Sequence, residues 1–400
     1  MPRFEPFAGV RYATSDGRLD DVLAPPYDVI TPEERRRLAG RSEHNAVRIE
    51  LPEEEDGRDR YGVAAALWEA WQAAGVLRTD EEPSFYVYRM GYHDEGGRPR
   101  QTTGVVGALT LSPLDEGDVL PHEYTTPKAR ADRLDLLRAC RANLSPIWAL
   151  STTEGLSTLC DPSGPPDARG TDDDGVHHRL WRVSAPGTVE AITAAVAANP
   201  VIIADGHHRY ETALAYRDER RAATNDAPGA YDAVLTWVVE ASEEQLTVAP
   251  THRLVSGLPE GFDLLAALDA FFEVADAGPA DGALPGRMAA GDALAVVTAA
   301  GAFLLRPKPA TEAAAGQALD TSRLDVALGA LPAHRLVYQH GIDQVLTAVA
   351  SGVAQAAFVV RPATIAQIAA VGRGGARMPP KTTFFTPKPR TGLVFRAVPG

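Results

Sequence analysis

One junction in this sequence limits the possible folds more than any other feature. Residues 201–204 form a short apolar run, Val-Ile-Ile-Ala, and a helical pattern extends from Tyr210 to Arg221. Only a short polar segment that contains Gly206 separates the two. A strand that joins a helix through a tight glycine turn is typical of folds that combine helices with a sheet. We therefore expect an α/β or α+β fold with mixed sheets.

The polar segment at this junction, from Asp205 to Arg209, is the strongest candidate for a chemical site. Gly206 lets the backbone turn sharply and lets a ligand approach closely. The helix that follows offers unpaired N–H groups and a partial positive charge, and the Arg209 guanidinium grips phosphate through two hydrogen bonds. We expect His207 and His208 to donate to phosphate oxygens, and Asp205 to act as a base or to hold Mg²⁺.

This segment has two other interpretations. The histidines would only cap the turn and pair with buried carbonyl groups if the segment were purely structural. A zinc site built on His207 and His208 is disfavoured, because adjacent histidines point in divergent directions and no HExxH pattern supplies a third ligand.

The chain has 400 residues, more than one hydrophobic core usually serves. We expect a catalytic or nucleotide-binding region at 1–256 and a C-terminal α/β region at 257–400 whose basic tail returns to the site. Thr31 and Pro32 predict the N-cap and the first position of a helix. The residue pattern also predicts helices near 59–74, 128–141 and 342–350, strands near 84–92, 102–111, 147–150 and 357–360, and a mobile surface loop over 164–175.

Charge and composition exclude several classes of protein. The formal net charge is −14, the wrong sign for a general nucleic-acid binder, so we expect no DNA partner. The sequence has no long apolar run and its first residues lack the apolar stretch of a secretory signal, so we expect no membrane partner. Cys140 and Cys160 form no CxxC or zinc pattern. We therefore expect a cytoplasmic protein.

The C-terminal residues differ in charge from the rest of the chain. No Asp or Glu occurs in 344–400, and the last forty residues hold seven Lys or Arg among many apolar residues. We predict a folded cationic surface that binds an anion such as phosphate, with Lys381, Thr382 and Lys388 as contacts. The segment lacks the GxxxxGK[ST] spacing of a Walker-type NTPase. The alternative is an edge strand that lysine and proline keep soluble.

A second polar cluster surrounds the start of the helix predicted near 128–141. His122, Glu123 and Thr125 precede the helix N-terminus, a place that favours anions. Arg130 and Arg133 are three residues apart and share a helix face. We expect His122, Thr125 and the two arginines to bind phosphate, and Glu123 to be catalytic. The alternative is an exposed ion-pair face that contributes little.

The N-terminal region holds weaker candidates for a substrate pocket. Tyr27 and Asp28 follow two prolines, and Asn45 with the histidine before it precedes a segment that predicts an alternating strand. We expect these three residues to contact the substrate, although turn chemistry explains Tyr27 and Asp28 equally well. Covalent hydrolysis is not expected, because no GxSxG motif occurs and Cys140 lies on a predicted helix without the surroundings of a nucleophile.

Five ordered motifs together resemble the DUF1015 family of uncharacterised bacterial proteins. They are APPYDVI, HNAVRIELP, the HEYT…DRLDLLRACRANLSPI block, ADGHHRYETAL and MPPKTTFFTPK. This family is distantly similar to the ParB/sulfiredoxin superfamily, in which free-serine kinases carry an Asp-Gly-His-x-Arg stretch. The resemblance implies that Gly206, His207, His208 and Arg209 bind the phosphates of ATP or ADP, with Asp205 beside Mg²⁺ or the reacting centre. It also implies a ParB/sulfiredoxin-like core.

We expect a kinase that transfers a phosphoryl group from a nucleotide to a small hydroxyl compound such as free serine. Its catalytic residues would be Asp205, His207, His208 and a carboxylate that takes the hydroxyl proton, for which Asp28, Glu50 and Glu123 are all candidates. Sulfiredoxin chemistry and ParB-type DNA partition are disfavoured. The alternatives are a nucleotide-sensing protein without transfer and a metal-dependent hydrolase built on the histidines. The sequence predicts no oligomeric state.

Overall fold

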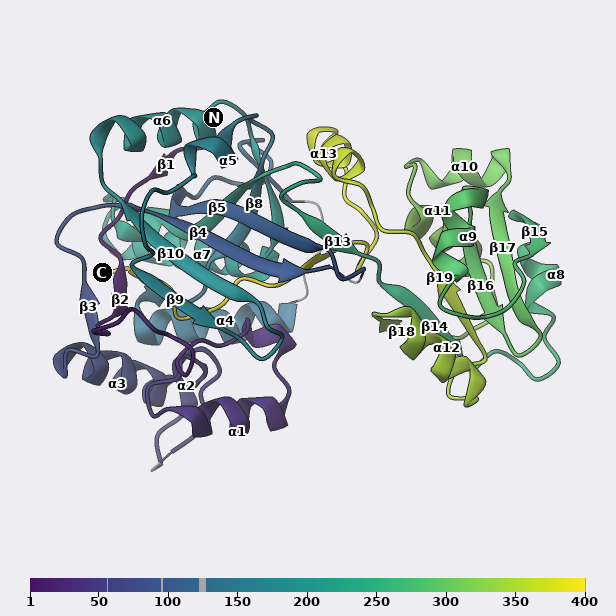
Figure 1. Cartoon of the computed structure of the whole chain (residues 1–400), viewed down its shortest axis with the longest axis horizontal. Helices are drawn as coiled ribbons and strands as arrows, with labels where there is room; N and C mark the ends of the chain where they lie inside the picture. The colour runs from purple at the N-terminus through teal and green to yellow at the C-terminus, as the bar shows by residue number, and fades with distance from the viewer. Residues whose placement is uncertain (56, 95, 122–126, 400) are drawn as a thin grey trace. The chain divides into compact units, whose positions relative to one another are not determined.

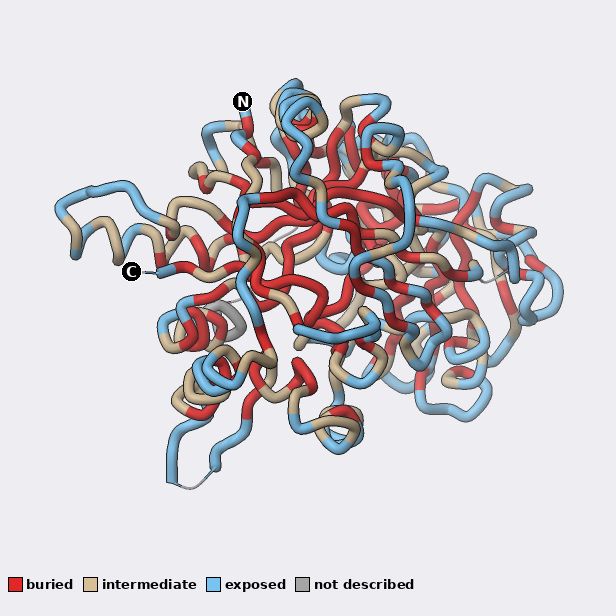
Figure 2. The backbone as a smooth tube through the Cα atoms, turned by 60° about the vertical axis from the view of Figure 1, so that its left-hand side comes forward, coloured by how far each residue is buried: buried red, intermediate tan, exposed pale blue. Residues whose placement is uncertain are grey.

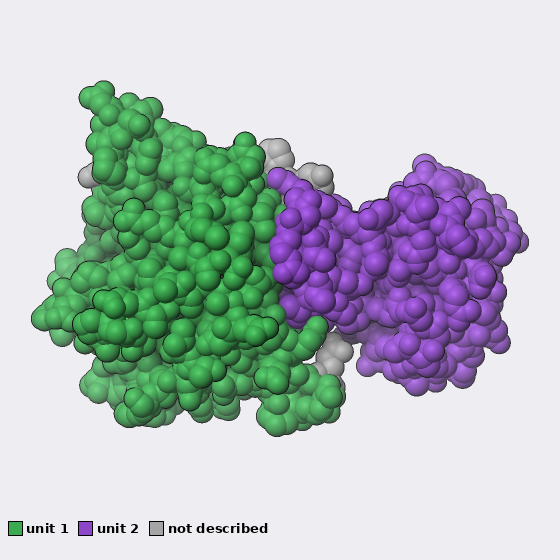
Figure 3. All heavy atoms as spheres, turned by 90° about the horizontal axis from the view of Figure 1, so that it is seen from above, with its two compact units in different colours: residues 1–247, 387–400 green, residues 248–386 purple. Residues whose placement is uncertain are grey.

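The structure is a computed structural model that describes residues 1–55, 57–94, 96–121 and 127–399, without the side chains of 127–130. The chain divides into two compact units, in which unit 1 comprises 1–247 and 387–400 and unit 2 comprises 248–386 (Figure 3). The basic tail is therefore shared between them: Lys381 and Thr382 belong to unit 2, and Lys388 belongs to unit 1. The expected functional division at 1–256 and 257–400 stays a prediction.

Unit 1 is built on a mixed sheet that has nine strands within the described residues. In spatial order they are β6 (Val119–Pro121), β11 (Val201–Asp205), β8 (Ile147–Ser151), β12 (Ala233–Glu240), β5 (Pro99–Thr110), β4 (Phe85–His93), β10 (His177–Val183) and β9 (Ala168–Thr171), and β1 (Phe4–Glu5) pairs with β5. Two pairs, β11 with β6 and β12 with β8, are parallel, and the other pairs are antiparallel. The expected mixed α/β architecture is confirmed.

Helices cover both faces of this sheet, with α5 and α6 on one side and α1 to α4 on the other (Figure 1). The helices of unit 1 are α1 (Pro32–Arg41), α2 (Val47–Glu50), α3 (Arg60–Ala73), α4 (Pro127–Cys140), α5 (Leu156–Leu159), α6 (Pro186–Ala197), α7 (His207–Ala223) and the 3₁₀ turns η1 (Tyr27–Val29) and η2 (Ala230–Asp232). Two small sheets pair β2 (Val10–Tyr12) with β3 (Leu77–Thr79) and β7 (Ala142–Asn143) with β21 (Arg396–Ala397). The last of these pairs joins the C-terminal residues to unit 1.

Local sequence chemistry explains where several helices begin. The Thr31 side chain accepts a hydrogen bond from the Glu34 amide at 3.2 Å, and Pro32 occupies the first turn, as predicted. Asp59 caps α3 by accepting from the amides of Tyr61 and Gly62. These caps supply acceptors for amides that the helices themselves leave unpaired.

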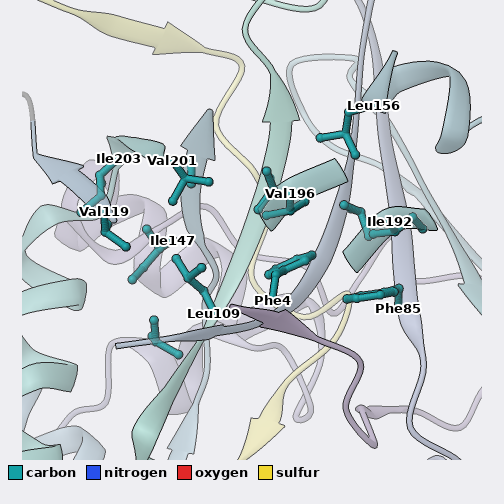
Figure 4. Packing of buried hydrophobic residues seen from close by; sticks show 14 of the residues in the cluster. Phe4, Phe85, Leu109, Val119, Ile147, Leu156, Ile192, Val196, Val201 and Ile203 are labelled. Carbon is teal, nitrogen blue, oxygen red and sulfur yellow. The ribbon is translucent and has the colours of Figure 1, made fainter. Parts of the chain in front are cut away.

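The core of unit 1 lies between the large sheet and the helices α5 and α6. Phe4 and Phe85 are fully buried and stack with ring centroids 5.1 Å apart. Leu156, Ile192 and Val196 belong to the same cluster of buried residues (Figure 4). Buried residues gather in the strands, whereas exposed residues gather in the outer turns (Figure 2). The same cluster includes Val201 and Ile203 of β11 and Tyr210 of α7, so this apolar packing supports the junction of β11 with α7.

Unit 2 has a six-stranded sheet of its own in the part of the chain that the structure describes. Its strands in spatial order are β15 (Phe272–Asp276), β17 (Gly301–Pro307), β16 (Leu294–Thr298), β19 (Ala356–Val359), β14 (His252–Ser256) and β18 (Arg335–Gln339), and β13 (Thr247–Ala249) pairs separately with β20 (Phe384–Thr386). Its helices are α8 (Leu264–Leu268), α9 (Leu284–Gly291), α10 (Pro309–Ala315), α11 (Asp320–Leu328), α12 (Ile342–Ala350) and α13 (Ile365–Arg373). The helix α12 has the bounds that the sequence predicts.

Three sequence predictions of local structure are wrong. The segment after Asn45, predicted as an alternating strand, forms the short helix α2, and the Val47 amide donates to Asn45 Oδ1 at 3.0 Å where this helix begins. The interval 164–175, predicted as a mobile loop, contains β9, whose alternating burial follows from its antiparallel pairing with β10. The helix predicted from Tyr210 begins at His207, so His207, His208 and Arg209 lie in its first turn. β9 forms because its pairing with β10 outweighs the turn-forming residues around it. The helix α7 begins early because the left-handed backbone at Gly206 lets it start directly after β11.

The predicted cationic surface of the tail also needs correction. Arg390 and Arg396 are buried. Arg396 donates to the carbonyl oxygens of Ala230 at 2.7 Å and Ala233 at 3.0 Å, and burial lowers its pKa to about 10. These charges make contacts within the fold rather than forming a surface.

No helix among the described residues is long and apolar enough to cross a membrane.

The core predicts a clear difference between two deletions of apolar side chains. Phe85→Ala should lower the free energy of unfolding of unit 1 by about 3–5 kcal/mol, because it leaves a cavity beside Phe4. Leu159→Ala, at a side chain 40% exposed, should lower it by less than about 1 kcal/mol. Denaturant unfolding followed by tryptophan fluorescence measures this, since all five tryptophans lie in 1–247. Equal losses in the two variants would contradict the described core.

Candidate functional site

The junction of β11 and α7 has the geometry that a ligand approaching the backbone requires. Gly206 has a φ of +93°, in the left-handed region that favours glycine, and as the N-cap residue it offers the helix no side-chain acceptor. A Cβ atom at this position would lie 3.0 Å from Arg209 Nε. The first amides of a helix of 17 residues therefore lie beside an arginine in a place that only glycine fits without strain.

Asp205 lies at the end of β11 and binds two cations. Its Oδ2 accepts a hydrogen bond from Arg209 Nη2 at 2.7 Å, and its Oδ1 accepts one from Lys388 Nζ. The exposed fractions of the Asp205, Arg209 and Lys388 side chains are 13%, 10% and 13%. Burial alone would raise the pKa of Asp205, but the charges of Lys388 and Arg209 outweigh it and hold the pKa at about 2. The three side chains thus carry one net positive charge at neutral pH.

Arg209 connects this cluster to residues from the N-terminal region. Its Nη1 donates to the carbonyl oxygen of Pro146. Burial alone would lower the pKa of Arg209, but the carboxylates of Asp205, Asp28 and Glu50 raise it above its usual range. The guanidinium therefore lies within the electrostatic reach of three carboxylates that belong to distant parts of the sequence.

Tyr27 and Asp28 lie near the same guanidinium. Burial raises the pKa of Tyr27 to about 12, although the charges of Arg209 and Arg133 oppose this rise. The Arg133 guanidinium lies over the Tyr27 ring, 4.1 Å from its centroid. Asp28 is exposed in the short turn η1. The structure thus brings Tyr27, Asp28, Arg133, Asp205 and Arg209 into one neighbourhood.

A buried polar network holds the segment that carries Lys388. Arg390 Nε donates to Asp172 Oδ2 at 2.8 Å, and His178 Nε2 lies 2.9 Å from the same oxygen. The hydroxyl of Tyr88 lies 2.9 Å from His178 Nδ1 and accepts from the Arg390 amide at 3.2 Å. Burial lowers the pKa of His178, which favours its neutral form. The network fixes Arg390, two residues after Lys388.

Sequence reasoning missed this network. Asp172 belongs to the interval predicted as a mobile loop, and Tyr88 and His178 belong to strands without any motif. The acidic run from Asp172 to Asp174 is the local signal that could have indicated a charged network. It does not show that the partner is Arg390, which is 218 residues away. Asp172 also accepts backbone hydrogen bonds from Asp174 and Val176 within its own turn.

Other residues from the sequence analysis lie elsewhere or have other contacts. Asn45 is fully buried, and its amide donates to the carbonyl oxygens of Asp21 and Leu23, so the described contacts give it a role in folding. In unit 2, Lys381 has a φ of +57°, and the Thr382 hydroxyl donates to the Pro379 carbonyl oxygen at 2.7 Å. His122, Glu123 and Thr125 lie outside the described residues, as does the side chain of Arg130.

The charges at this site bear on whether it fits Mg²⁺ or phosphate. Both oxygens of Asp205 already bind cations, so a Mg²⁺ ion there would meet the charges of Lys388 and Arg209. Among the described residues, no group of three or more His, Cys, Asp or Glu side chains is placed to hold a metal ion. Asp205 therefore does not fit a metal ligand, whereas two cations beside a helix N-terminus do fit an anion.

Comparisons with known proteins give one extensive match. A family model described as "Protein of unknown function (DUF1015)" matches residues 4–327. No curated protein matches the chain. Similar solved structures include a free serine kinase in complex with AMP (13% identity, TM-score 0.38, 72% of this chain and 91% of that chain). A conserved hypothetical protein from Pyrococcus furiosus (14%, 0.36, 74% and 95%) and SbnI with a C-terminal truncation from Staphylococcus aureus (14%, 0.38, 72% and 86%) are also similar.

The lowered pKa of Asp205 predicts a specific loss of stability in acid. A carboxyl group with a folded pKa of about 2 and a usual value of 3.8 stabilises the fold above about pH 4, and this contribution is lost as the pH falls toward 2. The full contribution is about 2 kcal/mol. The difference in unfolding free energy between wild type and Asp205→Asn should therefore shrink as the pH falls from 5 to about 2. Denaturant unfolding at each pH measures it, and a constant difference would contradict the assignment.

The backbone at residue 206 predicts the effect of a single methyl group. Gly206→Ala should lower the free energy of unfolding by about 1–2 kcal/mol, because an alanine at φ +93° is strained and its Cβ meets Arg209. Gly40→Ala is the matched control, since residue 40 lies in α1 and an added Cβ has nothing within 4 Å. We expect the control to be as stable as wild type or slightly more stable. Thermal unfolding of both variants decides, and equal stability of the two would refute the described turn.

Proposed function

The chain belongs to the DUF1015 family, and we propose that it is a phosphotransferase that moves a phosphoryl group from a nucleotide to the hydroxyl group of a small molecule such as free serine. The family model itself describes no activity, so the proposal rests on the geometry of unit 1 and on the resemblance of its Asp-Gly-His-His-Arg segment to that of free-serine kinases. A ParB/sulfiredoxin-like core is part of the same proposal.

The observation that carries the proposal is the binding of Lys388 and Arg209 to one ionised carboxylate at the start of α7. Asp205 neutralises one of the two cations and holds both in place. The remaining positive charge and the helix amides favour a polyphosphate. His207 and His208 lie in the first turn of the same helix, and we assign them as donors to phosphate oxygens.

Phosphoryl transfer requires positioning and charge stabilisation more than covalent chemistry from the protein. The substrate oxygen forms a bond to the terminal phosphorus, and the bond from that phosphorus to the bridging oxygen of the nucleotide breaks. The hydroxyl proton passes to a carboxylate, and Asp28, Glu50 and Glu123 stay the candidates for this role. Lys388 and Arg209 stabilise the charge on the transferred group. Because Asp205 binds two cations, we assign it to their positioning and not to Mg²⁺.

Lys381, Thr382, His122, Thr125 and Arg130 complete the phosphate contacts expected from the sequence, and these assignments stay proposals. The first two belong to unit 2, and the described contacts of the Thr382 hydroxyl include Thr321 Oγ1 at 2.9 Å. Substitutions at these positions test each of them separately from the cluster in unit 1.

Calorimetric titration with ATP, ADP and CTP, followed by a transfer assay with free serine and other small hydroxyl compounds, tests the proposal. Binding together with a phosphorylated product supports it. Binding without transfer to any acceptor would instead indicate a nucleotide-sensing protein, and no binding of any nucleotide would overturn both.

Removal of one cation predicts weaker nucleotide binding. Lys388→Gln should raise the nucleotide Kd by about tenfold or more, because a charge-assisted contact to phosphate contributes about 1.5–3 kcal/mol. Lys308→Gln is the matched control, since Lys308 lies in unit 2 and donates to the Asp269 carbonyl oxygen. Calorimetry measures both values of Kd, and an unchanged Kd in Lys388→Gln would remove the tail from the site.

A further inference from the structure

Four residues of unit 1 are joined by hydrogen bonds into a closed ring that includes His178. In the C-terminal segment, the Arg390 amide donates to the Tyr88 hydroxyl at 3.2 Å. That hydroxyl lies 2.9 Å from His178 Nδ1, and His178 Nε2 lies 2.9 Å from Asp172 Oδ2. The Arg390 guanidinium closes the ring, because its Nε donates to the same Asp172 oxygen at 2.8 Å. The ring therefore starts and ends on Arg390, two residues after Lys388.

The ionised state of Asp172 determines where the protons of this ring lie. Burial alone would raise the pKa of Asp172, but the hydrogen bond from His178 and the charge of Arg390 hold that pKa well below its usual range. An ionised carboxylate only accepts hydrogen bonds, so we assign the proton of neutral His178 to Nε2. Nδ1 is then an acceptor, and the Tyr88 hydroxyl donates to it while accepting from the Arg390 amide. Every contact of the ring therefore pairs a donor with an acceptor while His178 is neutral.

A proton added to His178 disturbs this ring because the ring lies away from water. His178 and Tyr88 are 0% and 1% exposed, and the side chains of Asp172 and Arg390 are 8% and 9% exposed. Protonation places a second N–H group, on Nδ1, against the Tyr88 oxygen. The Tyr88 proton then has no acceptor among the described contacts. A buried hydroxyl without an acceptor is costly, so protonated His178 works against the contact between Tyr88 and the Arg390 amide.

The charged groups near His178 act on it in opposite directions. Burial lowers the pKa of His178, and the charges of Arg390 and His177 lower it further, although the Asp172 carboxylate opposes them. His178 is therefore neutral at neutral pH and gains a proton only in acid. The ring is also bordered by Asp174, which accepts from Arg390 at 3.2 Å, and by the uncharged Gly170 and Met90, which lie opposite His178 on β9 and β4.

We propose that His178 is a pH-dependent latch for the C-terminal segment 387–400. Neutral His178 completes the ring and holds the segment in place. Protonated His178 opposes the contact between Tyr88 and the Arg390 amide, and it thereby loosens the segment.

The latch acts on the candidate site through Lys388. Lys388 belongs to the same segment and binds Asp205, so loosening of the segment withdraws a cation from the site. His178 is thus a positioning residue for Lys388 and touches no ligand itself. This effect on ligand binding rests on the proposed function, whereas the latch itself does not.

Hydrogen–deuterium exchange of the segment 387–400, measured at pH 7.5 and at pH 4.5, tests the latch. A group whose folded pKa is lowered from 6.5 stabilises the fold above that pH, and its contribution is lost as the pH falls below it. After correction for the intrinsic exchange rate, we expect amide protection in the segment to be lower by about tenfold or more at pH 4.5. Asp205, with a pKa of about 2, keeps its charge over this interval. The reporting amides are those of Arg390, Thr391 and Phe395, which donate to the Tyr88 hydroxyl and to the carbonyl oxygens of Ala24 and Val10.

Variants of two adjacent histidines separate the latch from the general effect of acid. His178→Gln keeps an amide donor for Asp172 but does not titrate, so protection of the segment should change by less than about twofold between the two pH values. His177→Gln is the matched control and should behave like wild type, since His177 is exposed and its Nδ1 lies 3.0 Å from Thr171 Oγ1. If His178→Gln does not fold, His178→Asn, which keeps an acceptor for Tyr88 and does not titrate, takes its place with the same expectation. Unchanged protection in wild type, or an equal fall in wild type and the variant without a histidine at 178, would overturn the latch.

Calorimetric titration with ADP at the same two pH values tests the effect on the site separately. We expect the Kd to rise in acid by a larger factor in wild type than in His178→Gln. An equal rise in both would overturn the role of His178 as a positioning residue for Lys388. If no nucleotide binds at either pH while the exchange result is as expected, the phosphotransferase is overturned and the latch is supported.

Discussion

The binding of one carboxylate by two cations connects parts of the molecule that are far apart in the sequence. Asp205 binds Arg209, four residues later, and Lys388, 183 residues later. In a largely buried site each charge depends on the others, because removal of one partner leaves an uncompensated charge away from water. These contacts therefore fix the positions of three segments relative to one another: the end of β11, the start of α7 and the C-terminal segment that carries Lys388. The geometry of any ligand site at this turn depends on that arrangement.

A second set of contacts makes the position of Lys388 precise. Asp172 holds the guanidinium of Arg390, and the backbone of Thr391 pairs with that of Ala24. Ala24 lies immediately before the prolines that carry the chain to Tyr27 and Asp28. The N-terminal and C-terminal segments are thus paired with each other where both contribute side chains to the neighbourhood of Arg209. A hydrogen-bonded network of this kind supports a site better than flexible side chains on a surface do.

The sequence allowed the local features of the fold to be predicted, because their causes are local. The cap at Thr31, the strand–glycine–helix junction and the helix at 342–350 all follow from residues within a few positions of one another. The strand at 168–171 could not be predicted in this way. Its neighbours favour turns, and the strand is stabilised by pairing with β10, which the turn-forming residues around it do not indicate. The predicted exposure of Arg390 and Arg396 failed for the same reason, because a charge pattern does not show which acceptors a distant segment will bring.

In the candidate site, too, the residues of a local motif could be predicted, whereas contacts between distant segments could not. Asp205, Gly206 and Arg209 were found from one motif, and Lys388 from the charge of the tail, but nothing in the sequence connects Lys388 to Asp205. Asp172, His178 and Tyr88 were missed because each is an ordinary residue of a strand or turn. Asn45 was chosen as a polar residue near a pocket, whereas its described hydrogen bonds join two backbone segments. The activity and the assignment of most site residues stay predictions.

The interruption of unit 1 by unit 2 has a consequence for how the protein is made. A ribosome synthesises residues 248–386 before it reaches Pro387, so all of unit 2 has been synthesised while unit 1 still lacks residues 387–400. Those residues include Phe395, which is fully buried and contacts Tyr12 and Trp68. Until residues 387–400 have been synthesised, unit 1 therefore lacks a buried aromatic side chain of its core. The charged cluster around Asp205 is complete only after Lys388 has been synthesised.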